Sequence, residues 1–167
     1  CSPPNLPGGP NPAIQSRTVS YDNLRKGRHS APGQMYLVTT VTAARRKLFA
    51  DFTTARRVIA EMRRMHEGGN VISMAWVLMP DHLHWLFQLG ESQTLARTMQ
   101  GFKGRSARAI NRDATLQLEI WQRGYHDHAL RTEEDVQEVA RYIAANPLRA
   151  SLVQHLGDYP HWDAVWL

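Results

Sequence analysis

Two histidines that are two residues apart are the first candidates for chemistry in this sequence. His82 and His84 belong to an apolar segment, residues 82–88, that is expected to form a strand. Successive side chains of a strand point to opposite faces, so the two imidazoles share one face while Leu83 and Trp85 point to the other. Two imidazoles on one face can bind a divalent metal ion. Exposed or hydrogen-bonded histidines without a metal give the same pattern, and this alternative stays open.

A tyrosine on a late helix is the candidate nucleophile. The helix is expected to begin near Thr132, with acidic residues in its first turn, and to end at Asn146 before Pro147. Its apolar residues recur at the helical period and define a buried stripe. Tyr142 lies off this stripe and shares a face with Glu138 and Asn146, four residues before and after it. A tyrosine at the edge of an apolar stripe can also serve the core, so a structural role is the alternative.

The histidines and the tyrosine together predict a phosphoryl-transfer reaction. A divalent ion held by His82, His84 and the side-chain oxygen of Asn146 would draw electrons from a non-bridging oxygen of a DNA phosphate. Tyr142 would then attack the phosphorus, leaving a phosphotyrosine link to the 5′ end and a free 3′ hydroxyl. Nitrogen and amide-oxygen ligands suit Mg2+ or Mn2+ better than a structural zinc site, which normally has four protein ligands.

The segments around these residues predict an α+β fold with an antiparallel sheet. Their order is strand, helix, strand, strand, helix, strand, followed by the helix of Tyr142, which is the split βαβ or ferredoxin-like pattern. Helices on one face would leave the other face, with the histidines, free. His126 and His128 would share one face of the fourth strand, and His128 is a candidate active-site contact, with a structural histidine as the alternative. The expected strands are residues 35–42, 71–79, 82–88 and 121–130, with a tight turn at 80–81, and the expected helices run from Thr53 or Thr54 to about His66 and from Thr94 to Arg112.

The charge distribution favours a polyanionic partner. The formal net charge is +5 and the sequence pI is about 9.8. The expected helix at 94–112 carries five basic residues and no acidic one, and the basic segment LRKGRHS at 24–30 precedes the first strand. Solvated surfaces without a partner are the alternative for both. The candidate DNA-binding residues are Arg25, Lys26 and Arg28 before the first strand and Lys103, Arg105, Arg108 and Arg112 in the helix.

The chain of 167 residues is long enough for the core of one domain. Residues 1–23 are expected to be a flexible Pro/Gly-rich tail, residues 24–150 the functional domain and residues 151–167 a C-terminal extension packed on it. The lone cysteine, Cys1, excludes an internal disulfide and favours a reducing compartment, so a cytoplasmic location is expected. No apolar run approaches the roughly 20 residues of a membrane span, and the start lacks the layout of a signal peptide. Because the chain begins with Cys1 rather than methionine, no function is assigned to its first residues.

Five stretches that span most of residues 24–150 carry a resemblance to a known family. They are LRKGRHS at 24–30, YLVTTVT at 36–42, WVLMPDHLHWLF at 76–87, WQRGYHDHALR at 121–131 and YIAANPLRA at 142–150. Together they resemble the HUH single-tyrosine transposases, and within these the REP-associated tyrosine transposases of bacteria. In this family the histidines at the positions of His82 and His84 bind the metal, and the tyrosine at the position of Tyr142 is the nucleophile. Related insertion-sequence transposases have a glutamine as third ligand where this sequence has Asn146, which keeps the oxygen but shortens its reach.

The resemblance also implies a substrate and an oligomeric state. The implied substrate is single-stranded DNA carrying a repetitive extragenic palindrome (REP) folded as a hairpin. A monomer is expected rather than the dimer of the insertion-sequence relatives. Two other functions stay open: a non-catalytic nucleic-acid-binding domain on the ferredoxin-like scaffold, and a metal-dependent nuclease that uses an activated water and does not need Tyr142. A relative that serves its host rather than mobilising DNA would have the same chemistry.

Overall fold

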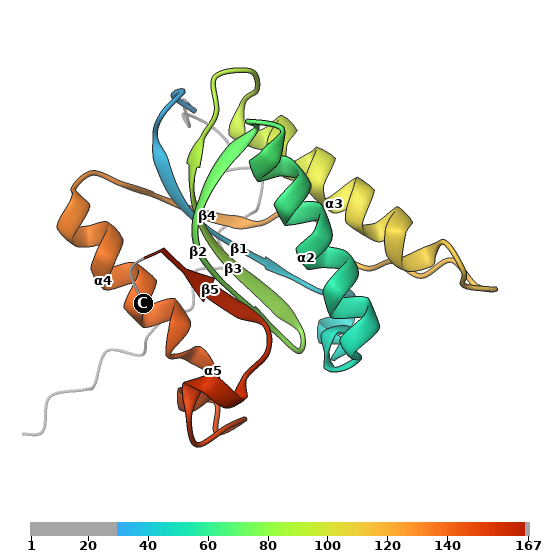
Figure 1. Ribbon diagram of the computed structural model, residues 1–167. Helices are drawn as coiled ribbons and strands as arrows, with labels where there is room; N and C mark the ends of the chain where they lie inside the picture. The colour runs from blue at the N-terminus through green and yellow to red at the C-terminus, as the bar shows by residue number, and fades with distance from the viewer. Residues whose placement is uncertain (1–29, 166–167) are drawn as a thin grey trace, which may run out of the picture.

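The centre of the protein is a five-stranded sheet (Figure 1). The computed structural model describes residues 30–165, so the expected N-terminal tail, Arg25, Lys26 and Arg28 lie outside the described residues. The strands are β1 (Met35–Val41), β2 (Val71–Met79), β3 (His82–Leu89), β4 (His126–Leu130) and β5 (Trp162–Ala164). Their order is β4-β1-β3-β2-β5, and every neighbouring pair is antiparallel. The first four strands follow the ferredoxin-like order, which confirms the expected fold class.

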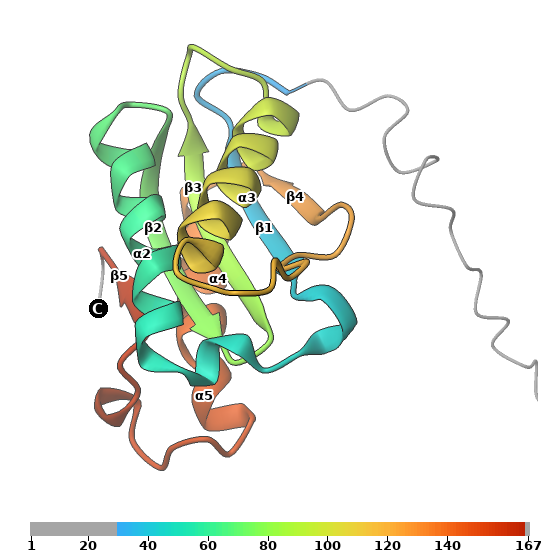
Figure 2. The ribbon, with the colours of Figure 1, turned by 90° about the vertical axis from the view of Figure 1, so that its right-hand side faces the viewer.

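Three long helices of the described chain cover the sheet from both sides. The helices α2 (Phe52–Glu67) and α3 (Leu95–Asn111) lie on one face, and α4 (Glu133–Ala144) lies on the other, as the two views show (Figures 1 and 2). A short helix, α5 (Asn146–Arg149), follows α4. The remaining helical pieces are the 3-10 turns η1 (Ala43–Arg45), η2 (Leu48–Ala50) and η3 (Leu156–Asp158).

Capping residues explain where the long helices begin and end. The first long helix starts at Phe52 because Asp51 Oδ2 accepts a hydrogen bond from the Thr54 backbone N–H at 2.7 Å, so the expected cap at Thr53 or Thr54 is wrong. Thr94 and Thr132 cap α3 and α4 in the same way, so both helices begin close to the predicted residues. The chain is helical beyond Asn146, contrary to expectation, since a proline is tolerated in the first turn of α5.

The strand register places four histidines on one face of the sheet. Thr39 of β1 pairs with His84 on one side and with His126 on the other. Directly paired residues of neighbouring strands point to the same face, so His84 and His126 share it. His82 and His128 lie two residues along their strands and share it as well.

Each face of the sheet has its own apolar core. Trp85 and Phe87 are fully buried beneath α2 and α3, whereas Leu86 is fully buried on the imidazole face against Ile143 of α4. The expectation of a free face is therefore wrong for this part of the sheet, because apolar side chains of β2 and β3 on that face need a covering layer. The core under α4 comprises Ala75, Val77, Met79, Leu86, Leu130, Val136, Ala140, Ile143 and Ala164.

Two strands differ from the expected ones. The fourth strand is His126–Leu130 rather than 121–130, because Trp121 forms only an isolated bridge with Thr42 and turns its indole N–H into the core to Ser106, at 3.0 Å. The sequence does not predict β5, whose three residues are too few to show a strand pattern, and this strand pairs with the outer edge of β2. Of the helices in residues 30–165, none has the length and apolar character needed to cross a membrane.

Candidate active site

The imidazoles of His82 and His84 lie next to each other at the start of β3. Their ring centroids are 4.8 Å apart and the ring planes are nearly perpendicular, at 81°. Both side chains are half-buried, and the intervening Leu83 is fully buried in the opposite core, as the alternation of the strand predicts. The pair therefore presents two imidazoles to one small region of the surface.

A different neighbour orients each ring through its Nδ1 atom. His82 Nδ1 lies 2.6 Å from Asp81 Oδ1, and His84 Nδ1 lies 2.7 Å from Thr39 Oγ1. Within the part of the chain that the structure describes, neither Nε2 atom has a hydrogen-bond partner. A hydrogen bond at one ring nitrogen fixes the ring and leaves the other nitrogen for a metal ion, which is how metal-binding histidines are usually held.

Asp81 is held in turn by Arg45, whose Nη1 lies 3.3 Å from Asp81 Oδ2. Burial opposes ionisation of Asp81, but its hydrogen bond with His82 and the charges of His82 and Arg45 outweigh burial and lower the pKa of Asp81 below 3.8. The carboxylate is therefore charged at neutral pH and accepts the N–H of His82. Ala44 and Arg45 have positive φ angles of 54° and 50°, a strained region for residues other than glycine, so the loop stores strain where it places Arg45.

His84 is in the form that a metal ligand requires. Burial, and after it the charges of His82 and Arg149, lowers the pKa of His84 to about 4. The ring is therefore neutral at physiological pH. Arg149 is the last residue of α5, and this helix packs against β2, the strand that pairs with the histidine strand β3.

The helix that carries Tyr142 lies over the same face of the sheet as the histidines. It packs against β2 and β3, and its buried stripe leaves the side chain of Tyr142 56% exposed, as the helical period predicts. The guanidinium carbon of Arg149 lies 3.8 Å from the centroid of the Tyr142 ring. The packing of α4 on β2 and β3 thus brings the predicted nucleophile and the histidine pair to one side of the sheet.

Asn146, the candidate third ligand, is the half-buried first residue of α5. Its Nδ2 donates to the Ile143 carbonyl oxygen at 3.1 Å, which leaves Oδ1 as an available acceptor. Residues 30–165 contain no group of three or more His, Cys, Asp or Glu side chains able to hold a metal ion, so a third protein ligand beside the two histidines would be of another kind. Two imidazole nitrogens and an amide oxygen fit Mg2+ or Mn2+ with open positions for a phosphate.

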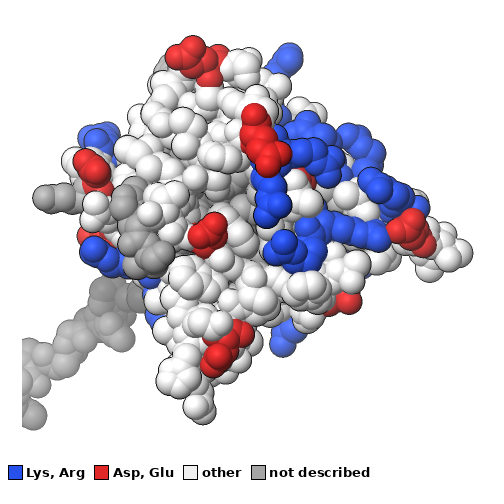
Figure 3. Space-filling model, viewed as in Figure 1, with Lys and Arg blue, Asp and Glu red and all other residues white. Residues whose placement is uncertain are grey.

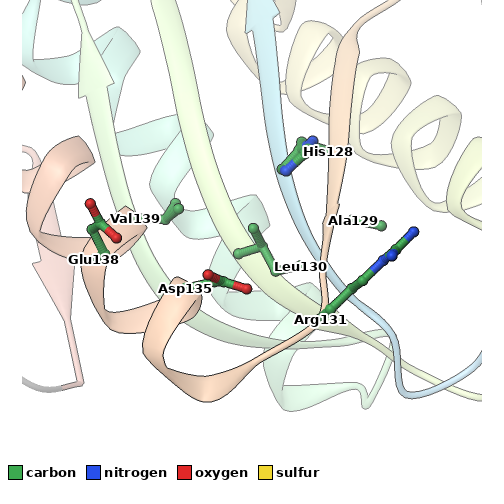
Figure 4. A pocket seen from close by; sticks show the side chains of 7 residues that line it. All are labelled: His128, Ala129, Leu130, Arg131, Asp135, Glu138 and Val139. Carbon is green, nitrogen blue, oxygen red and sulfur yellow. The ribbon is translucent and has the colours of Figure 1, made fainter.

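A groove of about 410 Å³ runs between β4 and α4 (Figure 4). His128 and Arg131 line it from the side of β4, and Asp135 and Glu138 line it from α4. The structure therefore places His128 beside the tyrosine helix. Thr39 pairs with His126 on one side and with His84 on the other, so His126 lies on the same face of the sheet, two strands away from the candidate metal ligand His84.

The basic candidates of α3 lie on the side of the sheet away from the histidines. Lys and Arg side chains gather over α2 and α3 in the space-filling view (Figure 3). Arg108 and Arg112 are exposed. The histidine face and this basic layer are thus separated by the sheet.

Lys103 and Arg105 have partners within the protein that the sequence does not predict. Lys103 Nζ donates to the carbonyl oxygens of Gln122 and Gly124, at 2.5 and 2.6 Å, and burial lowers the pKa of Lys103 to about 8. Arg105 donates to Glu61, whose side chain is buried. These contacts stabilise the fold and leave less charge for a bound phosphate.

Sequence reasoning misses three residues of this site: Thr39, Asp81 and Arg149. Asp81 stands beside His82 in the chain, which is a signal that could have been used. Thr39 meets His84 only through the strand register, and Arg149 meets Tyr142 only because the chain continues as α5.

A ferredoxin-like sheet with paired imidazoles beneath a tyrosine-bearing helix defines a class, the single-tyrosine transposases. The family described as "Transposase IS200 like" matches residues 31–146, so the chain belongs to this family. The chain is 26% identical over 145 residues, 80% of its length, to a Haemophilus influenzae protein named as a candidate REP-associated tyrosine transposase, of which it covers 81%. It is 30% identical over 89 residues to the REP-associated tyrosine transposase of Escherichia coli, covering 52% of this chain and 50% of that protein.

A solved structure has the same fold. It is the structure of a REP-associated tyrosine transposase bound to a REP hairpin, and it superposes with a TM-score of 0.67 over 81% of this chain and 79% of that one, at 22% identity. The enzyme class predicted from the sequence is thereby confirmed at the level of the transposase family.

Proposed function

We propose that the protein is a metal-dependent single-stranded DNA endonuclease and strand transferase that acts on REP-type hairpin DNA through a covalent 5′-phosphotyrosine intermediate. The observation that carries this proposal is the placement of exposed Tyr142 on the same side of the sheet as His82 and His84, with the guanidinium of Arg149 over the tyrosine ring. Membership of the transposase family supports the reaction type. The substrate is supported by the similar protein solved with a REP hairpin.

In the proposed reaction, Tyr142 Oη forms a bond to the phosphorus while the bond from phosphorus to the 3′ oxygen breaks. The phenol releases its proton to solvent and the departing 3′ oxygen takes one up, so charge and atoms balance. One phosphate ester replaces another, and attack by a second 3′ hydroxyl can rejoin the strand without a nucleotide cofactor. The exposure of Tyr142 gives a DNA strand access to its hydroxyl.

The proposed metal ligands are the Nε2 atoms of His82 and His84 and the Oδ1 atom of Asn146. Mg2+ or Mn2+ bound there supplies positive charge to a non-bridging phosphate oxygen. Asp81 and Thr39 keep the rings oriented so that both Nε2 atoms are available.

The proposed DNA contacts use the basic residues on the far side of the sheet. Exposed arginines of α3 can contact stem phosphates without reading bases. The contacts are Arg108 and Arg112 with the hairpin stem, and Arg25, Lys26 and Arg28, outside the described residues, with the unpaired flank. Lys103 and Arg105 serve mainly the fold, through their partners within the protein. We propose a monomer that acts in the cytoplasm, where chromosomal DNA lies, and expect a molar mass near 19.0 kDa by light scattering.

The proposal is tested by incubating the protein with hairpin-bearing single-stranded DNA and Mn2+ and separating the products under denaturing conditions. The unsubstituted protein should form a denaturation-resistant adduct with DNA. Tyr142→Phe should form none while still binding DNA, because the ring is kept and only the nucleophilic hydroxyl is lost. Tyr125→Phe is the matched control, since Tyr125 packs against the core, and it should keep the adduct.

Each other result identifies a different function. An adduct formed by Tyr142→Phe would mean that another group is the nucleophile. Cleavage without any adduct would support the nuclease that uses an activated water. DNA binding without metal-dependent cleavage would support the non-catalytic binding domain.

A further inference from the structure

Arg149 lies against the proposed nucleophile and is not neutralised. Its guanidinium carbon is 3.8 Å from the centroid of the Tyr142 ring, which is a cation–π contact. No carboxylate among the described side chains forms an ion pair with Arg149. Both Arg149 and Tyr142 are exposed, so the contact lies at a surface that a DNA strand can approach.

Arg149 also lies on the same side of the sheet as the imidazole pair. It ends α5, which packs against β2, and Met79 of β2 pairs with His82 of β3. An unpaired cation on this side of the sheet repels a divalent ion at the proposed metal site. In the protein without DNA, Arg149 should therefore weaken metal binding. A phosphate between the guanidinium and the ion would reverse this effect, since both cations are attracted to it.

The shape of a guanidinium allows it to contact a ring and a phosphate together. Its flat face stacks on an aromatic ring, while its N–H groups point outward in the plane and match two phosphate oxygens. Stacked on Tyr142, Arg149 has its in-plane N–H groups available for a phosphate. A lysine in its place would keep the charge but could not make both contacts.

We propose that Arg149 is a positioning residue that holds the Tyr142 ring with its face and the target phosphate with its N–H edge, and so makes metal binding depend on bound DNA. The inference rests on the proposed function, in which Tyr142 attacks a phosphate next to the metal held by His82 and His84. It adds a coupling between DNA and metal that those three residues alone do not provide.

The coupling is tested by titrating Mn2+ and measuring the free ion by electron paramagnetic resonance, in a Tyr142→Phe background that cannot cleave. Without DNA, Arg149→Gln should bind Mn2+ between about threefold and tenfold more tightly, because a repulsive charge is removed. Arg149→Lys, which keeps the charge, should match its parent, and so should Arg141→Gln, which removes an exposed arginine one residue from the tyrosine. With hairpin-bearing single-stranded DNA, the parent should gain Mn2+ affinity and the Arg149→Gln variant should lose most of that gain.

The positioning role is tested by single-turnover adduct formation with Tyr142 present, at saturating DNA and Mn2+. Arg149→Gln and Arg149→Lys should both slow adduct formation by roughly tenfold or more, because neither side chain offers a planar fork. Melting temperatures of both variants should stay at that of the unsubstituted protein, since Arg149 is exposed.

Two results would overturn the inference. One is an Arg149→Gln variant with unchanged Mn2+ affinity, with and without DNA, and an unchanged adduct rate. The other is a slower adduct rate that follows a lowered melting temperature and is rescued by lysine, which would make Arg149 structural only. Failure of the proposed function is a separate result, because it would appear as an adduct in Tyr142→Phe or as none in the unsubstituted protein, and the Mn2+ titration without DNA depends on neither.

Discussion

Asp81 and Thr39 orient neighbouring histidines by different kinds of hydrogen bond. The Asp81 carboxylate is charged, so its bond with His82 is charge-assisted and has one direction, from the ring N–H to the oxygen. The Thr39 hydroxyl is neutral and can either donate to or accept from His84 Nδ1. His84 is therefore held by the weaker restraint, and this restraint can be removed at Thr39 without changing the charge of the site.

Thr39→Val should weaken Mn2+ binding by roughly tenfold to a hundredfold, since it removes the partner of His84 Nδ1 while keeping the branched shape of the side chain. Calorimetric titration with Mn2+ measures the effect, with His84→Ala as the reference for complete loss of the ligand. Thr40→Val is the matched control: this hydroxyl is buried on the opposite face without a hydrogen-bond partner in the described residues, so its removal should leave metal affinity intact. Equal affinities for the two valine variants would show that Thr39 does not position the ring.

Residues whose role follows from their type and spacing can be predicted from the sequence. Residues whose role depends on contacts made by the fold cannot. His82 and His84 share a face because strands alternate, and Tyr142 leaves the apolar stripe because helices have a fixed period. Neither rule states that Thr39 will pair with His84 across two strands. No local rule places Arg149 over the ring of Tyr142, because that contact depends on how the chain turns after α4.

At the level of elements, a buried carboxylate joins the two helices of the basic layer. Glu61 of α2 is 1% exposed, and it pairs with Arg105 of α3 and, at 3.5 Å, with Arg64 of its own helix. A buried charge that loses its partner is costly, whereas an exposed arginine without one contributes little to stability. Arg105 and Arg108 of the same helix should therefore differ in their contribution to stability.

Arg105→Ala should lower the free energy of unfolding by about 1–3 kcal/mol, because Glu61 would keep only its longer contact with Arg64. Arg108→Ala should change it by less than about 0.5 kcal/mol, since its side chain is exposed. In DNA binding, Arg108→Ala should have the larger effect of the two. It should reduce the affinity for DNA and lower the number of counterions released on binding, measured from the salt dependence of that affinity, by about one. Urea unfolding and DNA titrations at several salt concentrations measure both effects. If Arg108→Ala binds DNA with unchanged affinity and salt dependence, α3 is a solvated helix rather than a DNA surface.

The order and type of the elements can be predicted from the sequence, but the side of the sheet that each helix covers cannot. The stripe of Val136, Ala140 and Ile143 predicts that α4 is buried on one side without indicating its partner. A partial signal exists in β2, where Val77, Leu78 and Met79 form an unbroken apolar run. Such runs are typical of strands buried on both faces, so they indicate a second covering layer.

On the scale of the whole molecule, the segment after α5 is hydrogen-bonded to β2 near the outer edge of the sheet. The Leu78 backbone N–H donates to the His161 carbonyl oxygen at 2.9 Å, and Tyr159 Oη donates to the Leu78 carbonyl oxygen at 2.7 Å. The His161 side chain is 5% exposed, between the rings of Phe52 and Tyr159, and its Nδ1 has no hydrogen-bond partner within residues 30–165.

The stability of the protein should fall as the pH drops below 6.5, in part because of His161. Burial, and then the charge of nearby Arg56, lowers the pKa of His161 below 6.5, so the unfolded chain takes up this proton more readily than the folded one. His161→Phe should flatten the pH dependence of the melting temperature between neutral pH and pH 5, while His155→Phe, at an exposed position, should leave it as it is. Parallel curves for all three proteins would remove His161 as a source of acid sensitivity.

The sheet stands between the imidazole pair, on the side of α4, and the basic layer of α2 and α3. Duplex DNA is stiff over about 150 base pairs, far more than the size of this protein, so a straight duplex resting on one side cannot also reach the other. A strand that leaves its stem and doubles back around the rim can contact both. The protein would then select DNA that can bend sharply, before any base is read. A straight, continuous duplex would be excluded by its shape alone.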